Sequence, residues 1–413
     1  MNIYLIIILA IIIAEYTLSL VVEILNVRNI DPALPEEFRG FYDESKYSAS
    51  QEYLKENTIF KLVKSTIFTA IVLVFILVGG FNVIDNLVRG PGQGPILSGL
   101  IFAGILVFGM QILDIPFSVY RTFVIEERYG FNKTTPKTFI LDIIKSWVLT
   151  IIIGGIIVAG ILWFFGKTGA LAWLYCWAAV AVFQIVIAFI APVVIMPLFN
   201  KFVPLEDGEL KKAIERYADS ENFRMKGIFK MDGSKRSAKS NAFFVGFGGS
   251  RRIALYDTLI NNHTVDEIVS VLAHEVGHYK KRHIIKGIVF SIVTSALMFY
   301  ILSLFINNPG LFAAFKMEHV SVYASLFFFG FLYSPINLGF SVLANVISRK
   351  HEYEADAYEV DTFKKPEASI LALKKLAVNH LANLTPHRLK VFMQYSHPPL
   401  LQRIQAIKRR QAR

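Results

Sequence analysis

Cysteine is nearly absent from this chain of 413 residues, with Cys176 as its single example. The chain therefore cannot form an intramolecular disulfide or a thiolate zinc site, which needs several ligands. Charged residues are also scarce, at 18% against about a quarter in typical soluble domains. The apolar residues lie in long uninterrupted runs, which indicates lipid as the solvent rather than one very large core.

Targeting and repeat features are missing as well. The N-terminus lacks the basic region, short apolar stretch and cleavage site of a secretory signal, so residues 3–25 are predicted to be a retained transmembrane helix. The formal net charge of +11 would suit nucleic acid, but the basic residues flank apolar runs and the C-terminus. An anionic membrane leaflet accounts for that placement. We therefore expect a lipid bilayer, and no nucleic acid, as a partner.

Seven apolar segments are each long enough to cross a hydrocarbon core of about 30 Å at about 1.5 Å per helical residue. Only residues 166–169 separate the fourth from the fifth, which predicts a tight antiparallel pair. The seven spans cover approximately residues 3–25, 62–84, 96–120, 147–166, 170–199, 285–307 and 321–347.

The loops between the spans predict an orientation. Basic residues are concentrated after spans one and three, whereas the three opposite loops hold one each, namely Arg89, Lys167 and Lys316. The positive-inside rule then places the N-terminus outside and residues 200–284 and 349–413 in the cytoplasm.

The two cytoplasmic regions have recognisable secondary structure. A helix is expected at 206–220, and the tail 349–413 is expected to be helical with a basic amphipathic end. Apolar runs on either side of Gly248-Gly249 predict a β-hairpin. The strand segments are 227–231, 241–247 and 252–256.

The strongest chemical signal is His274-Glu275-Val276-Gly277-His278, which follows a helix-compatible run with Thr264 as the N-cap candidate. On a helix, positions i and i+4 are about 40° apart, so both imidazoles can share one metal ion. Glu275 is rotated by about 100° from His274, which lets it act as a general base on a water molecule without binding the metal.

A third protein ligand is needed, because a catalytic zinc ion keeps its fourth position open. The downstream glycine and third histidine of the metzincin pattern are replaced by Lys281 and Ile284. On a continuing helix His283 would lie about 140° round from His278, so it is not expected to join the same face. The third ligand must come from another segment.

Residues 348–356 offer candidates just past the seventh span. Glu352 and Asp356 are at i and i+4, so one carboxylate could bind metal while the other orients a ligating imidazole. Glu354 would point about 200° away and is expected to be solvated. His351 is a rival ligand, and spacing alone leaves the choice open.

Membrane depth supports this pairing of segments. His278 precedes the sixth span by about seven residues and Glu352 follows the seventh by about five, so both lie within roughly 10 Å of the membrane boundary. Two helix extensions thus bring complementary ligands to the same depth.

The sequence resembles the type I CAAX prenyl proteases, multi-spanning zinc endopeptidases that process lipidated protein C-termini. The resemblance covers nearly the whole chain and includes six motifs in order. These are residues 127–132, 196–202 and 240–243, the His274 motif, residues 348–349 with Glu352 and 355–356, and residues 396–399 with Arg403.

The resemblance implies a role for each site residue. It makes Glu352 the third ligand of one Zn²⁺ ion per chain, Glu275 the activator of water and His397 a donor to the oxyanion. It also implies that Asn241, on an edge strand, holds substrate backbone by strand addition. Asp356 would be the partner of the zinc ligands, and Arg349 and Arg403 would be structural supports.

The expected fold is a multi-pass α-helical membrane protein with a mainly α, zincin-like metalloprotease domain that contains a small β-hairpin or sheet. Family members enclose a large water-filled chamber, and Glu15 and Asp114 are ionisable groups at membrane depth that would face it or pair within the bundle. We divide the chain into a membrane domain 1–200, a metalloprotease part 201–285, spans six and seven in 286–348, and a part 349–413 that supplies the third ligand and packs with 201–285.

Several functions are compatible with these residues. A zinc endopeptidase acting on prenylated C-terminal peptides is favoured, and a quality-control protease for membrane proteins is the alternative. A transporter or channel gives no reason for the HExxH helix. A catalytically silent scaffold is disfavoured, because structural zinc normally has four protein ligands, often thiolates, whereas this chain offers no cysteine for such a site and has Glu275 in place. The absence of an endoplasmic-reticulum retrieval signal and a short loop after span six favour a prokaryotic plasma membrane over the endoplasmic reticulum.

Overall fold

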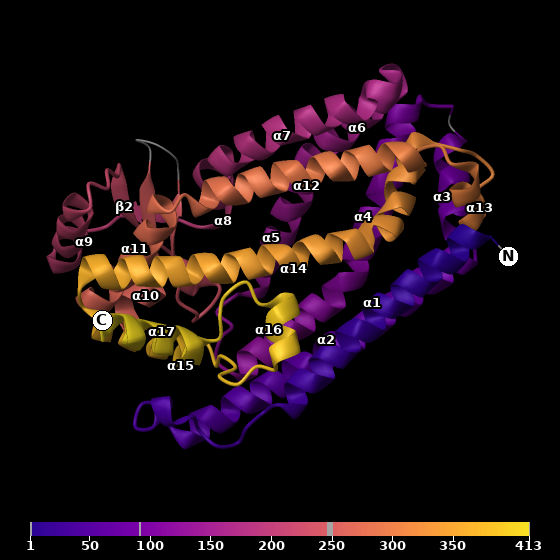
Figure 1. The fold of residues 1–413 in the computed structure, drawn as a ribbon. Helices are drawn as coiled ribbons and strands as arrows, with labels where there is room; N and C mark the ends of the chain where they lie inside the picture. The colour runs from indigo at the N-terminus through magenta and orange to yellow at the C-terminus, as the bar shows by residue number, and fades with distance from the viewer. Residues whose placement is uncertain (1, 91, 246–250, 413) are drawn as a thin grey trace.

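A computed structural model describes residues 2–90, 92–245 and 251–412 of the chain. Within these residues, seven helices are long and apolar enough to cross a membrane, and Figure 1 shows that most of them run side by side along the molecule. The predicted multi-pass membrane fold is therefore confirmed. The seven candidate spans are Ile3–Arg28, Glu44–Leu77, Pro95–Glu126, Pro136–Lys167, Gly169–Phe199, His283–Phe305 and Val322–Phe363.

These spans form or include the long helices of the fold. They contain α1 (Ile3–Arg28), α2 (Glu44–Leu77), α4 (Pro95–Tyr120), α5 (Pro136–Leu149), α6 (Gly155–Lys167), α7 (Ala172–Ile190), α8 (Met196–Phe199), α12 (His283–Phe305) and α14 (Val322–Phe363). The short helices α3 (Gly80–Arg89) and α13 (Pro309–Ala314) follow α2 and α12. As predicted, α6 and α7 pack against each other across their short connection (Figure 1).

The membrane helices bury little of their apolar surface within the chain. In the most apolar stretch of each span, only 6–22% of the residues are buried. A soluble protein of this composition would bury such stretches in a core, because apolar surface in water is unfavourable. Lipid is therefore the solvent for these surfaces.

Three spans extend further than their apolar runs predicted. The fourth begins at Pro136 rather than near residue 147. α2 begins at Glu44 rather than near residue 62, and α14 continues to Phe363 rather than ending near 347. An apolar run shows which residues match lipid, whereas a helix continues wherever its backbone hydrogen bonds do. Because α14 is continuous, it joins the seventh span rigidly to the segment that carries Glu352 and Asp356.

The two ionisable groups at membrane depth differ in their surroundings. Asp114 pairs with Lys64, accepts a hydrogen bond from Ser118 at 3.1 Å, and lines a hollow of about 460 Å³. Glu15 Oε1 is buried and makes no hydrogen bond to any described residue. Asp114 is therefore both paired and cavity-lining, so it combines the two alternatives predicted for it.

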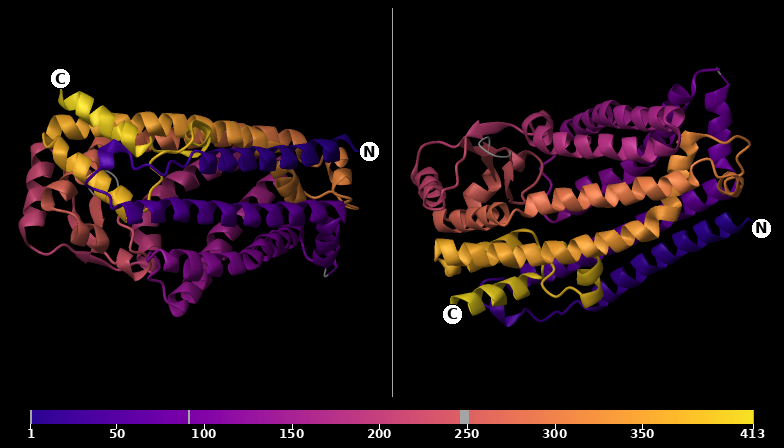
Figure 2. Two further views of the ribbon diagram at one scale, coloured as in Figure 1. Left: turned by 90° about the horizontal axis from the view of Figure 1, so that it is seen from below. Right: turned by 45° about the horizontal axis from the view of Figure 1, so that its top comes forward.

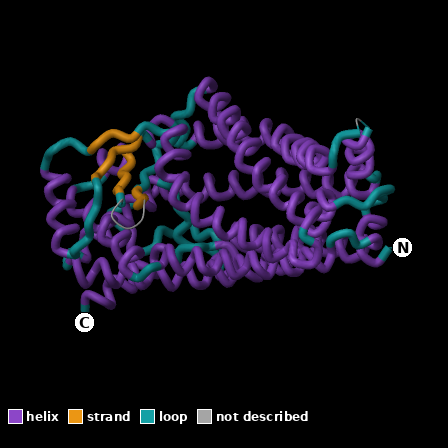
Figure 3. The backbone as a smooth tube through the Cα atoms, turned by 90° about the horizontal axis from the view of Figure 1, so that it is seen from above, coloured by secondary structure: helices purple, strands orange, loops and turns teal. Residues whose placement is uncertain are grey.

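A small sheet lies at one end of the molecule (Figure 3). Its strands are β1 (Phe202–Pro204), β2 (Gly227–Met231), β3 (Ala242–Val245) and β4 (Arg252–Tyr256), in the order β1-β2-β4-β3. The predicted antiparallel pairing of β3 with β4 is confirmed, although the glycine pair 248–249 lies outside the described residues. Strand β1 was not predicted, because three residues ending in proline are too short to show a period of two.

The sheet is connected to helices that hold the site. α9 (Glu209–Ser220) and α11 (Val265–Lys280) share one apolar core with β2 and β4, to which Ile214, Ile253 and Leu272 contribute. The short helix α10 (Asp257–Asn262) links β4 to α11. This core fixes the position of α11 relative to the sheet edge.

The C-terminal helices pack back onto the rest of the chain. They are α15 (Pro366–Asn379), α16 (Arg388–Gln394) and α17 (Leu400–Gln411). α17 lies beside α14, and the two termini stand at opposite ends of the molecule in both views of Figure 2. On α1, the buried Glu23 pairs with Lys390 of α16 and with Lys61 of α2. The tail is thereby tied to the membrane helices.

Candidate metal centre and active site

Helix α11 carries the paired histidines. The Thr264 hydroxyl accepts a hydrogen bond from the Glu267 N–H at 3.4 Å, and the Glu267 carboxylate accepts one from the Thr264 N–H at 2.9 Å. This capping box satisfies two backbone donors and determines where the helix begins. His274 and His278 then lie on one face, with their Nε2 atoms 3.1 Å apart.

α14 approaches α11 closely enough to bring a carboxylate to both histidines. A Cβ at Gly277 would lie 3.1 Å from the Cα and the carbonyl oxygen of Ala355, so glycine permits the approach without displacement. Glu352 Oε2 lies 3.4 Å from His274 Nε2, and Glu352 Oε1 lies 3.3 Å from His278 Nε2. The three side chains that form the predicted ligand set converge on one point.

These distances fit a tetrahedral zinc ion. Zinc–ligand bonds of about 2.0–2.2 Å place two ligand atoms of a tetrahedron about 3.3 Å apart, and the three separations here are 3.1–3.4 Å. Glu352 Oε2 is buried and makes no hydrogen bond to a described residue, although Arg403 Nη1 lies 3.4 Å away. A buried carboxylate oxygen that accepts no hydrogen bond is costly, and a metal ion would use its free lone pairs, so the residues fit a metal ion.

Asp356 and Arg403 surround the other side of His274. Asp356 Oδ1 lies 2.9 Å from His274 Nδ1, and Arg403 donates to both Asp356 oxygens at 2.6 and 2.9 Å. Burial lowers the pKa of His274, but hydrogen bonds to Asp356 and Glu352 outweigh it and raise the pKa to about 10. A carboxylate on Nδ1 fixes the ring so that Nε2 faces the metal position.

A second group of potential ligands consists of His274, Asp356 and Glu359. Arg403 already engages both oxygens of Asp356, and the Ser369 hydroxyl donates to Glu359. Protein donors therefore satisfy these carboxylates. The group with Glu352 is the better metal site.

The catalytic candidates line one cavity of about 370 Å³. Glu275, His397 and Asn241 border it together with two of the metal ligands, His274 and Glu352. Burial raises the pKa of Glu275, although the nearby His274 and His278 lower it. The cavity also has an apolar wall formed by Leu259, Val271, Ala372, Leu373 and Leu376.

His397 lies beside the ligand Glu352, and Asn241 lines the same cavity from the edge of the sheet. His397 Nε2 lies 3.3 Å from Glu352 Oε1, and its side chain is 63% exposed. Ser396 Oγ lies 3.0 Å from His397 Nδ1. Asn241 directly precedes β3, the edge strand, and its carbonyl accepts a hydrogen bond from the Tyr256 N–H at 3.0 Å.

Arg349 lies outside the ligand group and contacts the tail. Its guanidinium donates to the carbonyl of Val391 at 2.9 Å and to that of Tyr395. These bonds hold the segment that leads from α16 to His397. Six of the predicted site residues thus line one cavity, namely Asn241, His274, Glu275, Glu352, His397 and Arg403. His278 and Asp356 contact members of this group, whereas Arg349 lies outside it.

His283 lies outside the ligand group as expected, but the continuous helix assumed for it and the solvation expected of Glu354 are wrong. α11 ends at Lys280, and Arg282 adopts a left-handed conformation with φ of 57°, so His283 does not continue the helix. Its Nδ1 lies 2.9 Å from His278 Nδ1, and its Nε2 lies 3.0 Å from Glu354 Oε2. Glu354 is therefore bound to a neighbour of the site rather than fully solvated. The rival candidate His351 stacks on His283 instead of joining the ligand group.

The chain is similar to known proteins over most of its length. Residues 23–201 match the family described as CAAX prenyl protease N-terminal, five membrane helices, and residues 204–411 match peptidase family M48. CAAX prenyl protease 1 homolog from Arabidopsis thaliana is 38% identical over 91% of this chain and 90% of that protein. CAAX prenyl protease 1 from Saccharomyces cerevisiae is 34% identical over 93% of this chain and 89% of that protein.

The chain belongs to the type I CAAX prenyl protease family. The crystal structure of S. mikatae Ste24p superposes with a TM-score of 0.91 at 34% identity, over 98% of this chain and 99% of that one. The chain is therefore a multi-pass membrane metalloprotease, which confirms the predicted enzyme class. Membership of a protease family argues against the transporter and scaffold alternatives.

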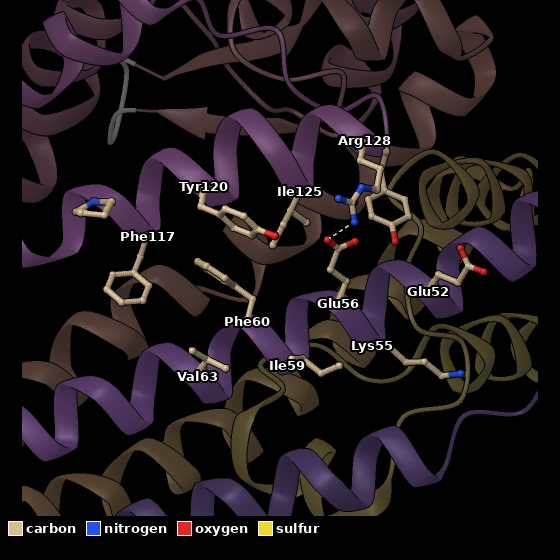
Figure 4. A pocket seen from close by; sticks show the side chains of 12 residues that line it. Glu52, Lys55, Glu56, Ile59, Phe60, Val63, Phe117, Tyr120, Ile125 and Arg128 are labelled. Atoms are coloured by element: carbon tan, nitrogen blue, oxygen red, sulfur yellow. Dashed lines mark hydrogen bonds and ion pairs between the residues drawn. The ribbon is translucent and has the colours of Figure 1, made fainter.

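This member of the CAAX prenyl protease family has a further hollow, which is separate from the candidate metal site. It has a volume of about 790 Å³ between α2 and α4, where Phe60 faces Tyr120 and an ion pair joins Glu56 to Arg128 (Figure 4). Phe60 and Tyr120 stack with ring centroids 5.6 Å apart. None of the residues that line it in the described chain belongs to the candidate site.

Proposed function

We propose that the chain is a zinc-dependent endopeptidase that holds one zinc ion and cuts peptide bonds near the C-termini of prenylated proteins. The observation that carries the proposal is the convergence of His274, His278 and Glu352 at tetrahedral spacing beside Glu275. Family membership supports the protease chemistry. The relatives' name, CAAX prenyl protease 1, supports the substrate class.

The three ligands would hold the metal and leave one tetrahedral position free. Held by these three side chains, zinc would supply Lewis acidity that polarises a carbonyl and lowers the pKa of water. The orientation of His274 would come from Asp356, which Arg403 in turn holds in place.

Glu275 would move the proton. As the oxygen of water bonds to the peptide carbonyl carbon, Glu275 accepts a proton from that water, and the same proton passes to the amide nitrogen when the carbon–nitrogen bond breaks. Burial raises the pKa of Glu275, which makes its carboxylate a better base. The second proton of the water stays on the new carboxyl group, so the products are a carboxylic acid and an amine, and atoms and charge balance.

His397 would donate to the developing oxyanion. Partial desolvation at the cavity lowers the pKa of His397, although its side chain is largely exposed, and this favours the neutral form. Because Nδ1 can accept from the Ser396 hydroxyl, the ring proton would stay on Nε2, the atom nearest the metal ligands. A neutral donor aimed at the oxyanion stabilises the transition state more than the ground state.

Asn241 and the edge of β3 would position the substrate. β3 is paired on one side only within the described sheet, so an extended peptide can add along its other edge. Asn241 at the start of this strand lines the same cavity as Glu275, which would bring a bound peptide past the metal position.

The catalytic side is proposed to be cytoplasmic, on the loop charges alone. The relatives named above are eukaryotic, so they give no support to a prokaryotic plasma membrane over the endoplasmic reticulum. That preference stays a prediction. A role in clearing misfolded membrane proteins stays the alternative to prenylated substrates.

The test is hydrolysis of a farnesylated CAAX peptide and of its unprenylated counterpart by purified protein, with cleavage sites mapped by mass spectrometry. We expect Glu275→Gln to lower the rate by about 10²–10⁴-fold. The exposed Glu206→Gln is the matched control. A zinc chelator should stop wild-type turnover. Equal rates for both variants would refute the mechanism, and equal cleavage of both peptides would refute the prenyl requirement.

A further inference from the structure

The two histidines of α11 differ in what meets their second ring nitrogen. His274 Nδ1 faces the Asp356 carboxylate directly at 2.9 Å. His278 Nδ1 instead faces another imidazole nitrogen, His283 Nδ1, at 2.9 Å. The far nitrogen of that second ring, His283 Nε2, lies 3.0 Å from Glu354 Oε2. A carboxylate therefore reaches His278 through an intervening histidine.

The positions of the protons in this row of hydrogen bonds, from His278 through His283 to Glu354, are set by the groups at its two ends. If His278 binds metal through Nε2, its ring proton must be on Nδ1, which then donates to His283 Nδ1. An accepting Nδ1 requires the proton of His283 to be on Nε2. The Glu354 carboxylate, which can only accept, demands the same tautomer. Both ends select one arrangement, so Glu354 and His283 together present the Nε2 lone pair of His278 to the metal position.

The surroundings hold His283 in this role. Its side chain is only 4% exposed, and its ring stacks on His351 with centroids 3.9 Å apart and planes 9° from parallel. The left-handed conformation of Arg282, rare for a residue with a Cβ, turns the chain back so that His283 meets His278. Such a backbone conformation persists only where its surroundings hold it in place.

We propose that His283 and Glu354 are positioning residues for the metal ligand His278. This inference rests on the proposed zinc site and extends it. Glu354 would orient His278 as Asp356 orients His274, but it would do so through the imidazole of His283 instead of by direct contact. Partners of this kind fix the tautomer and the plane of a ligating ring, and their loss weakens metal binding by about 10–100-fold.

The test is metal affinity of the full-length protein in detergent, measured by competition with a chromophoric zinc chelator. We expect His283→Leu and Glu354→Ala to weaken zinc binding by about 10–100-fold. His283→Asn should recover part of the loss, because its carboxamide oxygen can accept from His278 Nδ1–H. The exposed His319→Ala and Glu206→Ala are matched controls and should bind zinc as wild type does.

A spectroscopic measurement separates positioning from a general loss of structure. With cobalt(II) in place of zinc, His283→Leu should change the intensity or position of the visible ligand-field bands, because the coordination geometry changes. If His283→Leu does not fold, Glu354→Ala decides the question, since Glu354 lies at the surface with 32% of its side chain exposed. Zinc affinity and cobalt spectra like those of wild type in Glu354→Ala would overturn the proposal.

The zinc site itself is tested in parallel. If wild type binds no zinc, or if His274→Ala binds it as tightly as wild type, the proposed function fails. If wild type binds tightly and His274→Ala does not, while the His283 and Glu354 variants match wild type, only this further inference fails.

Discussion

Adding one methyl group at Gly277 would test the close approach of α11 and α14. A Cβ there would lie 3.1 Å from the Cα and carbonyl oxygen of Ala355, so one helix must move by a few tenths of an ångström. Overpacking of this kind costs about 1–3 kcal/mol, and alanine regains about 1 kcal/mol of helix propensity over glycine. We therefore expect Gly277→Ala to destabilise the protein by about 0–2 kcal/mol.

The same displacement should also weaken the metal site. Gly277 directly precedes His278, and Ala355 follows Glu352 by one helical turn, so the displacement widens the 3.3 Å separation between these two ligands. We expect zinc affinity to fall by about tenfold, equivalent to about 1.4 kcal/mol, with a similar loss of peptide hydrolysis. Chelator competition, peptide cleavage and thermal unfolding in detergent measure the three quantities.

Gly287→Ala is the matched control, because a Cβ at Gly287 in α12 meets nothing within 4 Å. It should retain zinc affinity and activity. Gly277→Ala with the zinc affinity and turnover of Gly287→Ala would refute the claim that close helix packing sets the ligand geometry.

Three further predictions follow from single contacts. Thr264→Ala removes the capping box of α11 and should cost about 1 kcal/mol of stability; unchanged thermal unfolding would contradict this role. Burial lowers the pKa of His380 to about 4, below about 6.5 in the unfolded chain. The unfolded state therefore binds the proton first, so stability is complete above about pH 6.5 and falls by at most about 1.4 kcal/mol per pH unit down to pH 4. His380→Gln should reduce the acid-side slope in pH-dependent unfolding, to which His283 also contributes, and an identical slope would count against it. Glu352→Gln should leave the protein folded but without bound zinc in metal analysis, and one equivalent of zinc would exclude Glu352 as a ligand.

Local periodicity predicted the parts of the fold that depend on neighbours in sequence. The spans, the hairpin of β3 and β4, and the shared helix face of His274 and His278 all follow from residues a few positions apart. One of the carboxylates near residue 352 was expected to bind the same metal as the histidines, because both segments lie at the same depth relative to the membrane boundary. The choice of Glu352 among them came from the family resemblance, because spacing alone left it open.

The surroundings of His278 could not be predicted in this way. The angle of about 140° between His278 and His283 holds only for a continuous helix. The chain instead turns at Arg282, and no glycine in the sequence marks that turn. The contact between His283 and Glu354 joins α12 to α14, which are far apart in the sequence. The basic run at residues 280–282 was the only available sign that α11 ends there.

The most direct test of the account is an X-ray anomalous difference map of the zinc-loaded protein at the zinc absorption edge. The account predicts one peak per chain, within about 2.0–2.2 Å of His274 Nε2, His278 Nε2 and a Glu352 oxygen. A peak among His274, Asp356 and Glu359 instead, or no peak in protein that cleaves the peptide, would contradict it.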